Sequence, residues 1–161
     1  MIKEVVGDIL LTDAQVIAHG VAPNDHFDKG LALSLRENYP AMVKAFRQFC
    51  HRTNPSPGKA WSWSDDRGDQ VIVNLLTQEP AKNAHGQPGE ATLPNVNHAI
   101  KELVKIVKKQ KIKSLAIPKV ATGLGKLDWD DVRPILYNRL KGLDIPIYVY
   151  TLFRKGEKAL E

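Results

Sequence analysis

Three stretches of this sequence combine glycine with polar residues in patterns that suit the binding of a phosphate-containing molecule: 7–9, 19–32 and 118–127. Glycine lets a ligand come close to the backbone, and amide groups in tight turns or at helix N-termini bind anions. Each stretch follows an apolar run that reads as a strand. In open α/β sheets such loops lie where ligands bind.

The first stretch is Gly7-Asp8-Ile9. Gly7 permits a tight backbone path, and the Asp8 carboxylate could accept a hydrogen bond from an exocyclic amine. An ordinary turn at the end of a strand would explain the same residues.

The second stretch leaves a strand at Gly20 and Val21 and enters a helix through Asp28-Lys29-Gly30-Leu31. Amides at such a helix start can bind an anion, with Gly30 allowing close approach and Lys29 adding positive charge. Asp28 could instead cap the helix.

The third stretch contains Ala121-Thr122-Gly123-Leu124-Gly125 between a strand and a helix. Two glycines separated by one residue suit a turn whose amides point at a phosphate group. The stretch lacks both the lysine spacing of a P-loop and the last glycine of a dinucleotide fingerprint. Alone it is therefore a weak indication of a phosphate site, and it becomes stronger when it is considered together with the second stretch.

Candidate catalytic groups lie in the second stretch: His19, Asp25 and His26. A carboxylate or an imidazole can orient or deprotonate a water molecule. The alternatives are that His19 is a core residue and that Asp25 and His26 are ordinary polar loop residues. No metal site and no cofactor is expected.

The elements that position these loops alternate between strand and helix. Strands are expected at 2–6, 16–21, 60–64, 70–77, 114–120 and 145–152, and helices at 31–39, 40–50, 92–107 and about 128–140. Pro134 implies a late start or a kink in the last helix. This order indicates an α/β fold with a largely parallel or mixed central sheet flanked by helices. We expect a single domain over 1–153 and a polar C-terminal tail over 154–161 that frays.

The composition fits a folded domain of 161 residues with a net charge of +5. No apolar run approaches the roughly 20 residues that span a bilayer, and no signal segment is evident, so no membrane association is expected. The lone Cys50 suits a reducing cytoplasm.

Seven lysines lie between Lys101 and Lys119. They leave direct nucleic-acid binding open but unsupported, because no aromatic residues are interleaved, and a solvated helix face is favoured.

At the three glycine-bearing stretches, and over nearly the whole chain from 2 to 152, the sequence resembles the macrodomain family. Family members open with Gly-Asp-Ile, enter a helix through a segment like Lys29-Gly30-Leu31-Ala32, and carry a second phosphate loop like 121–125 followed by Leu-x-Trp, here Leu127-Asp128-Trp129. The closing Val149-Tyr150-Thr151-Leu152 is also similar. The resemblance implies a three-layer α/β/α macrodomain whose mixed, largely parallel sheet is flanked by helices.

The similarity is greatest to the branch with the terminal ADP-ribose glycohydrolases, the antitoxin that removes ADP-ribose from DNA and the ADP-ribose 1''-phosphate phosphatase. It implies that Asp8 contacts the adenine amine, that the second stretch holds the distal ribose and phosphates, that 121–125 holds the diphosphate, and that Leu152 belongs to the site.

Two departures separate this sequence from the glycohydrolases. They use a lysine just after the buried central strand, where this chain has Gln78, and an acidic residue at or beside the position of Gly125. The long polar loop 78–91 with His85-Gly86 looks more like the phosphatase.

We expect a monomeric hydrolase of ADP-ribose derivatives, acting by water attack on ADP-ribose 1''-phosphate or on ADP-ribosylated protein or nucleic acid. The alternative is a non-catalytic reader of ADP-ribose.

Overall fold

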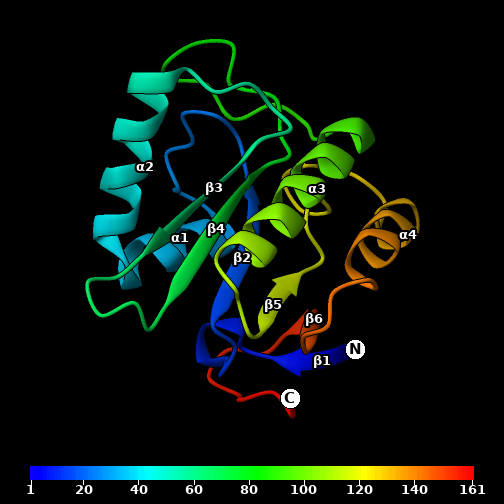
Figure 1. Cartoon of the computed structure of the whole chain (residues 1–161). Helices are drawn as coiled ribbons and strands as arrows, with labels where there is room; N and C mark the ends of the chain where they lie inside the picture. Colours follow the sequence, from blue (N-terminus) through cyan, green and yellow to red (C-terminus); the bar gives the residue numbers. More distant parts are fainter.

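The computed structural model describes all residues, 1–161, as one six-stranded sheet with helices on both sides (Figure 1). In chain order the elements are β1 (Ile2–Gly7), the short 3₁₀ helix η1 (Ile9–Leu11), β2 (Val16–Val21), α1 (Gly30–Asn38), α2 (Pro40–Thr53), β3 (Ala60–Ser64), β4 (Val71–Leu76), α3 (Leu93–Lys109), β5 (Leu115–Pro118), α4 (Trp129–Leu140) and β6 (Ile147–Phe153).

The strands lie in the order β1-β6-β5-β2-β4-β3. All neighbouring pairs are parallel except β3 with β4, which is antiparallel. The expected mixed, largely parallel sheet is therefore confirmed. The five parallel strands all end at one edge of the sheet, so the loops that follow them gather there.

Helices cover both faces of the sheet and make the fold three-layered, as expected (Figure 1). On one face α3 and α4 pack on strand residues such as Val16 and Val73, and on the other α1 and α2 pack on Val21 and Ile72. The strands β2 and β4 are buried almost throughout, because both of their faces are covered.

Local signals explain where α3 and α4 begin. Thr92 caps α3 by accepting a hydrogen bond from the Asn95 amide at 3.1 Å, and Asp128 caps α4 by accepting one from the Asp130 amide at 3.0 Å. Of the two alternatives for Pro134, a late start or a kink, the late start is wrong, because α4 begins at Trp129 and includes the proline. The capped start and the burial of one helix face outweigh the hydrogen bond that proline cannot donate.

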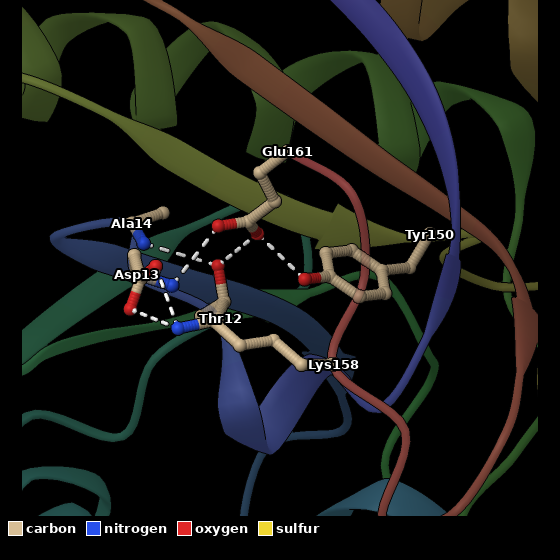
Figure 2. Close-up of polar contacts among 6 residues, drawn as sticks. All are labelled: Thr12, Asp13, Ala14, Tyr150, Lys158 and Glu161. Carbon is tan, nitrogen blue, oxygen red and sulfur yellow. Dashed lines mark hydrogen bonds and ion pairs between the residues drawn. The ribbon is translucent and has the colours of Figure 1, made fainter.

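The segment 154–161 does not fray as expected but packs against the start of the chain. The Glu157 carbonyl accepts a hydrogen bond from the Asp8 amide at 2.7 Å, and Ala159 is buried. Glu161 accepts hydrogen bonds from the hydroxyls of Thr12 and Tyr150 (Figure 2). The contacts with Asp8 and Thr12 join residues about 150 positions apart in the sequence, so no local pattern could have indicated them.

Candidate functional site

A cleft of about 460 Å³ lies at the edge where the parallel strands end. Its walls come from the loop after β2, the start of α1, the residue Gln78 after β4, and the loop after β5. The lining residues are His19, Gly20, Asp25, Asp28, Lys29, Gly30, Leu31, Ala32, Gln78, Pro88, Pro118, Lys119, Val120, Ala121, Gly123, Leu124 and Gly125.

A second cavity of about 430 Å³ continues this cleft toward β1 and β6, sharing Gly30, Leu31 and Pro118 with it. It adds the residues Gly7, Ile9, Ser34, Tyr150 and Phe153. The two cavities adjoin at these shared residues, and together they are called the elongated cleft, with an aromatic end at β6 and a polar end at β2 and β4. Such a shape suits an extended ligand with one flat apolar group.

The middle of the cleft is formed by backbone in unusual conformations. Gly30 at the start of α1 has φ +59°, and Ala121 after β5 has φ +66°. Left-handed backbone is costly for a residue with a side chain, and such strain gathers at functional sites. The free amides at the start of α1 add a partial positive charge beside Lys29, which suits an anion.

The two glycines of the loop after β5 have different reasons to be glycine. A Cβ on Gly125 would lie 2.6 Å from the Ala121 carbonyl oxygen and 2.9 Å from the Ala91 Cβ, so this position has no room for a side chain. A Cβ on Gly123 would meet nothing within 4 Å. Because Gly123 lines the cleft, a side chain there would enter the ligand's space.

His19 lies on β2 directly opposite Asn74 of β4, and its Nε2 is 2.7 Å from the Asn74 Oδ1. The Asn74 Nδ2 faces the Met42 sulfur at 3.5 Å, which accepts but does not donate here, so Oδ1 is the atom turned toward histidine. Nε2 therefore carries the proton, and Nδ1 is left as an acceptor. Burial lowers the pKa of His19 to about 4, so the ring is neutral near pH 7.

Asp25 lines the cleft, but both of its carboxylate oxygens accept hydrogen bonds from its own loop, from the Ala22 amide at 3.0 Å and the Phe27 amide at 2.9 Å. These bonds hold a loop in which Asn24 and Phe27 have left-handed backbone. His26 lies outside the lining and donates from Nε2 to the Ala84 carbonyl at 3.1 Å. It thereby ties the loop after β2 to the long loop 78–91.

Most of the predicted ligand-binding residues do line the elongated cleft: Gly7, Ile9, Gly20, Asp28, Lys29, Gly30, Leu31, Ala121, Gly123, Leu124 and Gly125. Asp28 does not cap α1, since Lys29 occupies the cap position without a side-chain bond.

Four predicted residues lie outside the lining. Val21 is in the core under α2, and the Thr122 hydroxyl donates to the Lys119 carbonyl at 2.7 Å. Leu152 is half exposed beside the lining residue Phe153. The Asp8 carboxylate accepts hydrogen bonds from the amides of Leu10 at 3.0 Å and Gly156 at 2.9 Å.

Sequence reasoning did not assign to the site the lining residues Gln78, Tyr150 and Phe153. Gln78 could have been found from its place directly after a buried parallel strand, where side chains reach the ligand edge. Tyr150 and Phe153 come from β6, and only the pairing of β6 with β1 and β5 brings them to the cleft.

No group of three or more His, Cys, Asp or Glu side chains is arranged to hold a metal ion, and none of the helices combines the length and the apolar character needed to cross a membrane.

A family model described as "Macro domain" matches residues 24–136 of the chain. A "DNA ADP-ribosyl glycohydrolase" of Mycobacterium tuberculosis is 28% identical over 147 residues, which cover 88% of this chain and 40% of that protein. An "ADP-ribose 1''-phosphate phosphatase" of Lodderomyces elongisporus is 22% identical over 162 residues, which cover 92% of this chain and 98% of that protein. The chain thus spans two fifths of the glycohydrolase but nearly all of the phosphatase.

Two solved structures have the same fold. The macrodomain of Mycobacterium tuberculosis DarG has a TM-score of 0.82 at 26% identity, covering 93% of this chain and 97% of that one. Thermosipho africanus DarTG in complex with ADP-ribose has a TM-score of 0.81 at 23% identity, covering 98% of this chain and 42% of that one.

Proposed function

This chain belongs to the macrodomain family, and from that premise we propose that it binds ADP-ribose in the elongated cleft and hydrolyses an ADP-ribose derivative held there. The observation that carries the proposal is that the two cavities adjoin at the start of α1, where both are lined by Gly30 and Leu31. An adenine fits the aromatic end at Phe153, a diphosphate fits the amides beside Gly30 and 121–125, and the terminal ribose fits the polar end.

The names of the relatives support two substrate classes. The glycohydrolases act on ADP-ribosylated DNA and the phosphatase on ADP-ribose 1''-phosphate, as their names state. We propose that this chain acts on a derivative of one of these classes, an ADP-ribosylated protein or nucleic acid or the 1''-phosphate. Each would place its leaving group at the polar end of the cleft.

The reaction needs a group that accepts a proton from the attacking water. His19, Asp25 and His26 are the residues that we propose for this part of the chemistry. His19 has the strongest support, because its ring is neutral near pH 7 and its Nδ1 has no hydrogen bond within the protein. Asp25 and His26 support the loop after β2 through the hydrogen bonds described above.

Calorimetry with ADP-ribose and a hydrolysis assay with the two substrate classes test the proposal in separate steps. We expect a dissociation constant in the micromolar range, which corresponds to a free energy of binding of about −8 kcal/mol. We also expect release of free ADP-ribose from at least one substrate. The absence of binding at millimolar ADP-ribose would refute the whole proposal.

The second candidate function is a non-catalytic reader of ADP-ribose. It is favoured by the engagement of both Asp25 oxygens and by Gly125, which offers no acidic side chain. Tight ADP-ribose binding without any product from either substrate class would establish the reader and exclude the hydrolase.

We further propose that the domain acts as a monomer in the cytoplasm. Its lone cysteine, Cys50, is buried in the core and suits a reducing compartment. Light scattering on the purified chain tests the first point and cell fractionation the second. A stable dimer or an exported protein would contradict them.

A further inference from the structure

Two buried polar side chains follow β4 at the polar end of the cleft. Thr77 is fully buried and Gln78 is 5% exposed. Burying a polar group without a partner costs roughly 1–3 kcal/mol, so such groups usually have a reason to be present. The Thr77 hydroxyl is the atom to which this cost applies, because it is buried and has no partner. The Gln78 side chain has a partner for its nitrogen alone, and its oxygen is not fully buried.

The orientation of the Gln78 amide follows from its one hydrogen bond. Nε2 donates to the Gly89 carbonyl at 3.1 Å, and a carbonyl requires the nitrogen rather than the oxygen to face it. Gly89 lies outside the cleft lining, whereas Gln78 belongs to it. With Nε2 engaged by Gly89, the amide oxygen, Oε1, is the polar atom of this cleft-lining side chain that receives no hydrogen bond from a protein group.

The partner of Gln78 is itself held in place. The Gly89 amide donates to the Glu79 carbonyl at 2.8 Å, and a Cβ on Gly89 would lie 3.0 Å from the Glu79 Cβ. A bridge between Gln78 and Ala91 closes the same loop. The acceptor is thus fixed before any ligand arrives, which is the arrangement that catalysis favours.

The strand order identifies the part of the ligand that Gln78 meets. Phe153 ends β6, Pro118 ends β5, and Gln78 follows β4 on the far side of β2. A ligand with its adenine at Phe153 and its diphosphate at the centre brings its terminal ribose to Gln78.

We propose that Gln78 is a catalytic residue whose Oε1 accepts a hydrogen bond from the attacking water and aims it at C1'' of the terminal ribose; this rests on the proposed hydrolase function. The water oxygen bonds to C1'', and the C1''–X bond breaks with its electron pair going to the leaving group X. The water's proton ends on X, so one water is consumed and ADP-ribose is released. A glutamine side chain orients the attacking water in GTP-hydrolysing proteins in the same way.

Three variants test the proposal. Gln78→Met removes both polar atoms at similar length, Gln78→Glu keeps an acceptor and loses the donor to Gly89, and Gln87→Met makes the same change in the same loop outside the cleft. The measurements are kcat and KM for ADP-ribose 1''-phosphate and for ADP-ribosylated DNA, the affinity for ADP-ribose, and the thermal midpoint.

If Oε1 orients water, Gln78→Met lowers kcat on the order of 100-fold while the affinity for ADP-ribose and the thermal midpoint stay near those of the wild type. Gln78→Glu restores much of kcat and adds an acidic limb to the pH profile, because its acceptor can now be protonated. Gln87→Met behaves as the wild type.

Wild-type kcat in Gln78→Met would overturn the role of Gln78, and so would equal losses in the Met and Glu variants, since both break the bond to Gly89. If Gln78→Met does not fold, the comparison of Gln78→Glu with the wild type decides through the pH profile, whose lack of an acidic limb would count against the proposal. A wild type that turns over neither substrate would refute the hydrolase function and Gln78 with it.

Turnover of the 1''-phosphate in ¹⁸O-labelled water tests the site of attack separately. Attack at C1'' leaves the released phosphate unlabelled, because its oxygens all come from the substrate. Labelled phosphate would show attack at phosphorus and would overturn the proposed geometry.

Discussion

His19 and Asn74 face each other across β2 and β4 and are joined by a hydrogen bond. The contact relates the tautomer of the histidine to the orientation of the asparagine amide. The Asn74 oxygen requires the proton of the histidine to be on Nε2. The Met42 sulfur, which accepts from Nδ2, determines which way the asparagine amide is oriented. A buried polar pair of this kind is stable only if its members are satisfied. Burial keeps the ring neutral, whereas the hydrogen bond to Asn74 acts in the opposite direction by raising the pKa, so the pair fixes the tautomer of His19 and not its charge.

The pKa of His19 predicts an acid sensitivity of the fold. The ordinary pKa of 6.5 applies in the unfolded chain and about 4 in the folded protein, so the unfolded state binds more protons between these values. Above pH 6.5, His19 does not lower the free energy of unfolding. As the pH drops from 6.5 to 4, the free energy of unfolding falls by about 3 kcal/mol in all.

Urea unfolding at several pH values checks this prediction. His19→Gln should flatten the loss of stability between pH 6.5 and 4, whereas His51→Gln on the exposed side of α2 should leave it unchanged. Equal slopes in the wild type and His19→Gln would show that other groups cause the acid sensitivity.

At the scale of the elements, the site is made by loops that follow strands and by the start of one helix. The loop after β5 is strained at Ala121 and closed tightly at Gly125, while Gly123 faces open space. The C-terminal segment supports the β1 side by packing on Gly7 and Asp8. Loop and segment therefore contribute to the cleft without any regular structure of their own.

Gly123→Glu should abolish ADP-ribose binding, at least about 100-fold or 2.7 kcal/mol, and leave the thermal midpoint nearly unchanged. The reason is that a side chain at this position enters the cleft without meeting protein atoms, and its charge repels the diphosphate. Calorimetry and thermal unfolding check both parts.

The matched control is Gly125→Ala. It should lower stability itself, because its Cβ would overlap the Ala121 carbonyl. Unimpaired binding in Gly123→Glu would mean that the loop after β5 does not hold the diphosphate.

Glu161→Ala should destabilise the fold by about 1–3 kcal/mol, since it removes the acceptor for Thr12, for the Asp13 amide and for the half-buried hydroxyl of Tyr150 (Figure 2). Lys158→Ala breaks an exposed ion pair with Asp13 and should change stability little. Thermal and urea unfolding of the two variants give the comparison. Equal effects would show that the Glu161 cluster adds nothing beyond surface charge.

At the scale of the whole molecule, the strand order arranges the cleft. Adjacent strand ends supply an aromatic group from β6, backbone amides from the loops after β5 and β2, and the Gln78 amide after β4. The end of each strand therefore supplies a different kind of binding group along the cleft. A ligand that reaches all of them must be about as extended as ADP-ribose.

ADP-ribose at 100 times its dissociation constant should therefore stabilise the protein by about 2.7 kcal/mol and raise the thermal midpoint by roughly 5–10 °C. ADP at the same concentration should raise the thermal midpoint less, because ADP lacks the terminal ribose and leaves the polar end of the cleft empty. Differential scanning calorimetry with both ligands checks this. Equal shifts would mean that the polar end of the cleft takes no part in binding.

The order of the elements, the mixed α/β class and the three glycine-bearing loops could all be predicted from the amino-acid sequence. These follow from apolar periodicity, from the backbone freedom of glycine and from caps such as Thr92, all of which act between residues close in the chain. The same loops supplied most of the residues that line the cleft.

Which polar groups are free to act became clear from the folded structure. The oxygens of Asp25 are occupied by amides of its own loop, His26 is bound to a carbonyl 58 residues away, and Gln78 keeps a free oxygen. The tail docks, and Phe153 reaches the cleft, because β1 pairs with β6 at the other end of the chain. Apart from the bonds within the Asp25 loop, these contacts join residues at least 11 positions apart. Whether they form depends on the positions of those residues in space, which leave no periodic trace in the sequence.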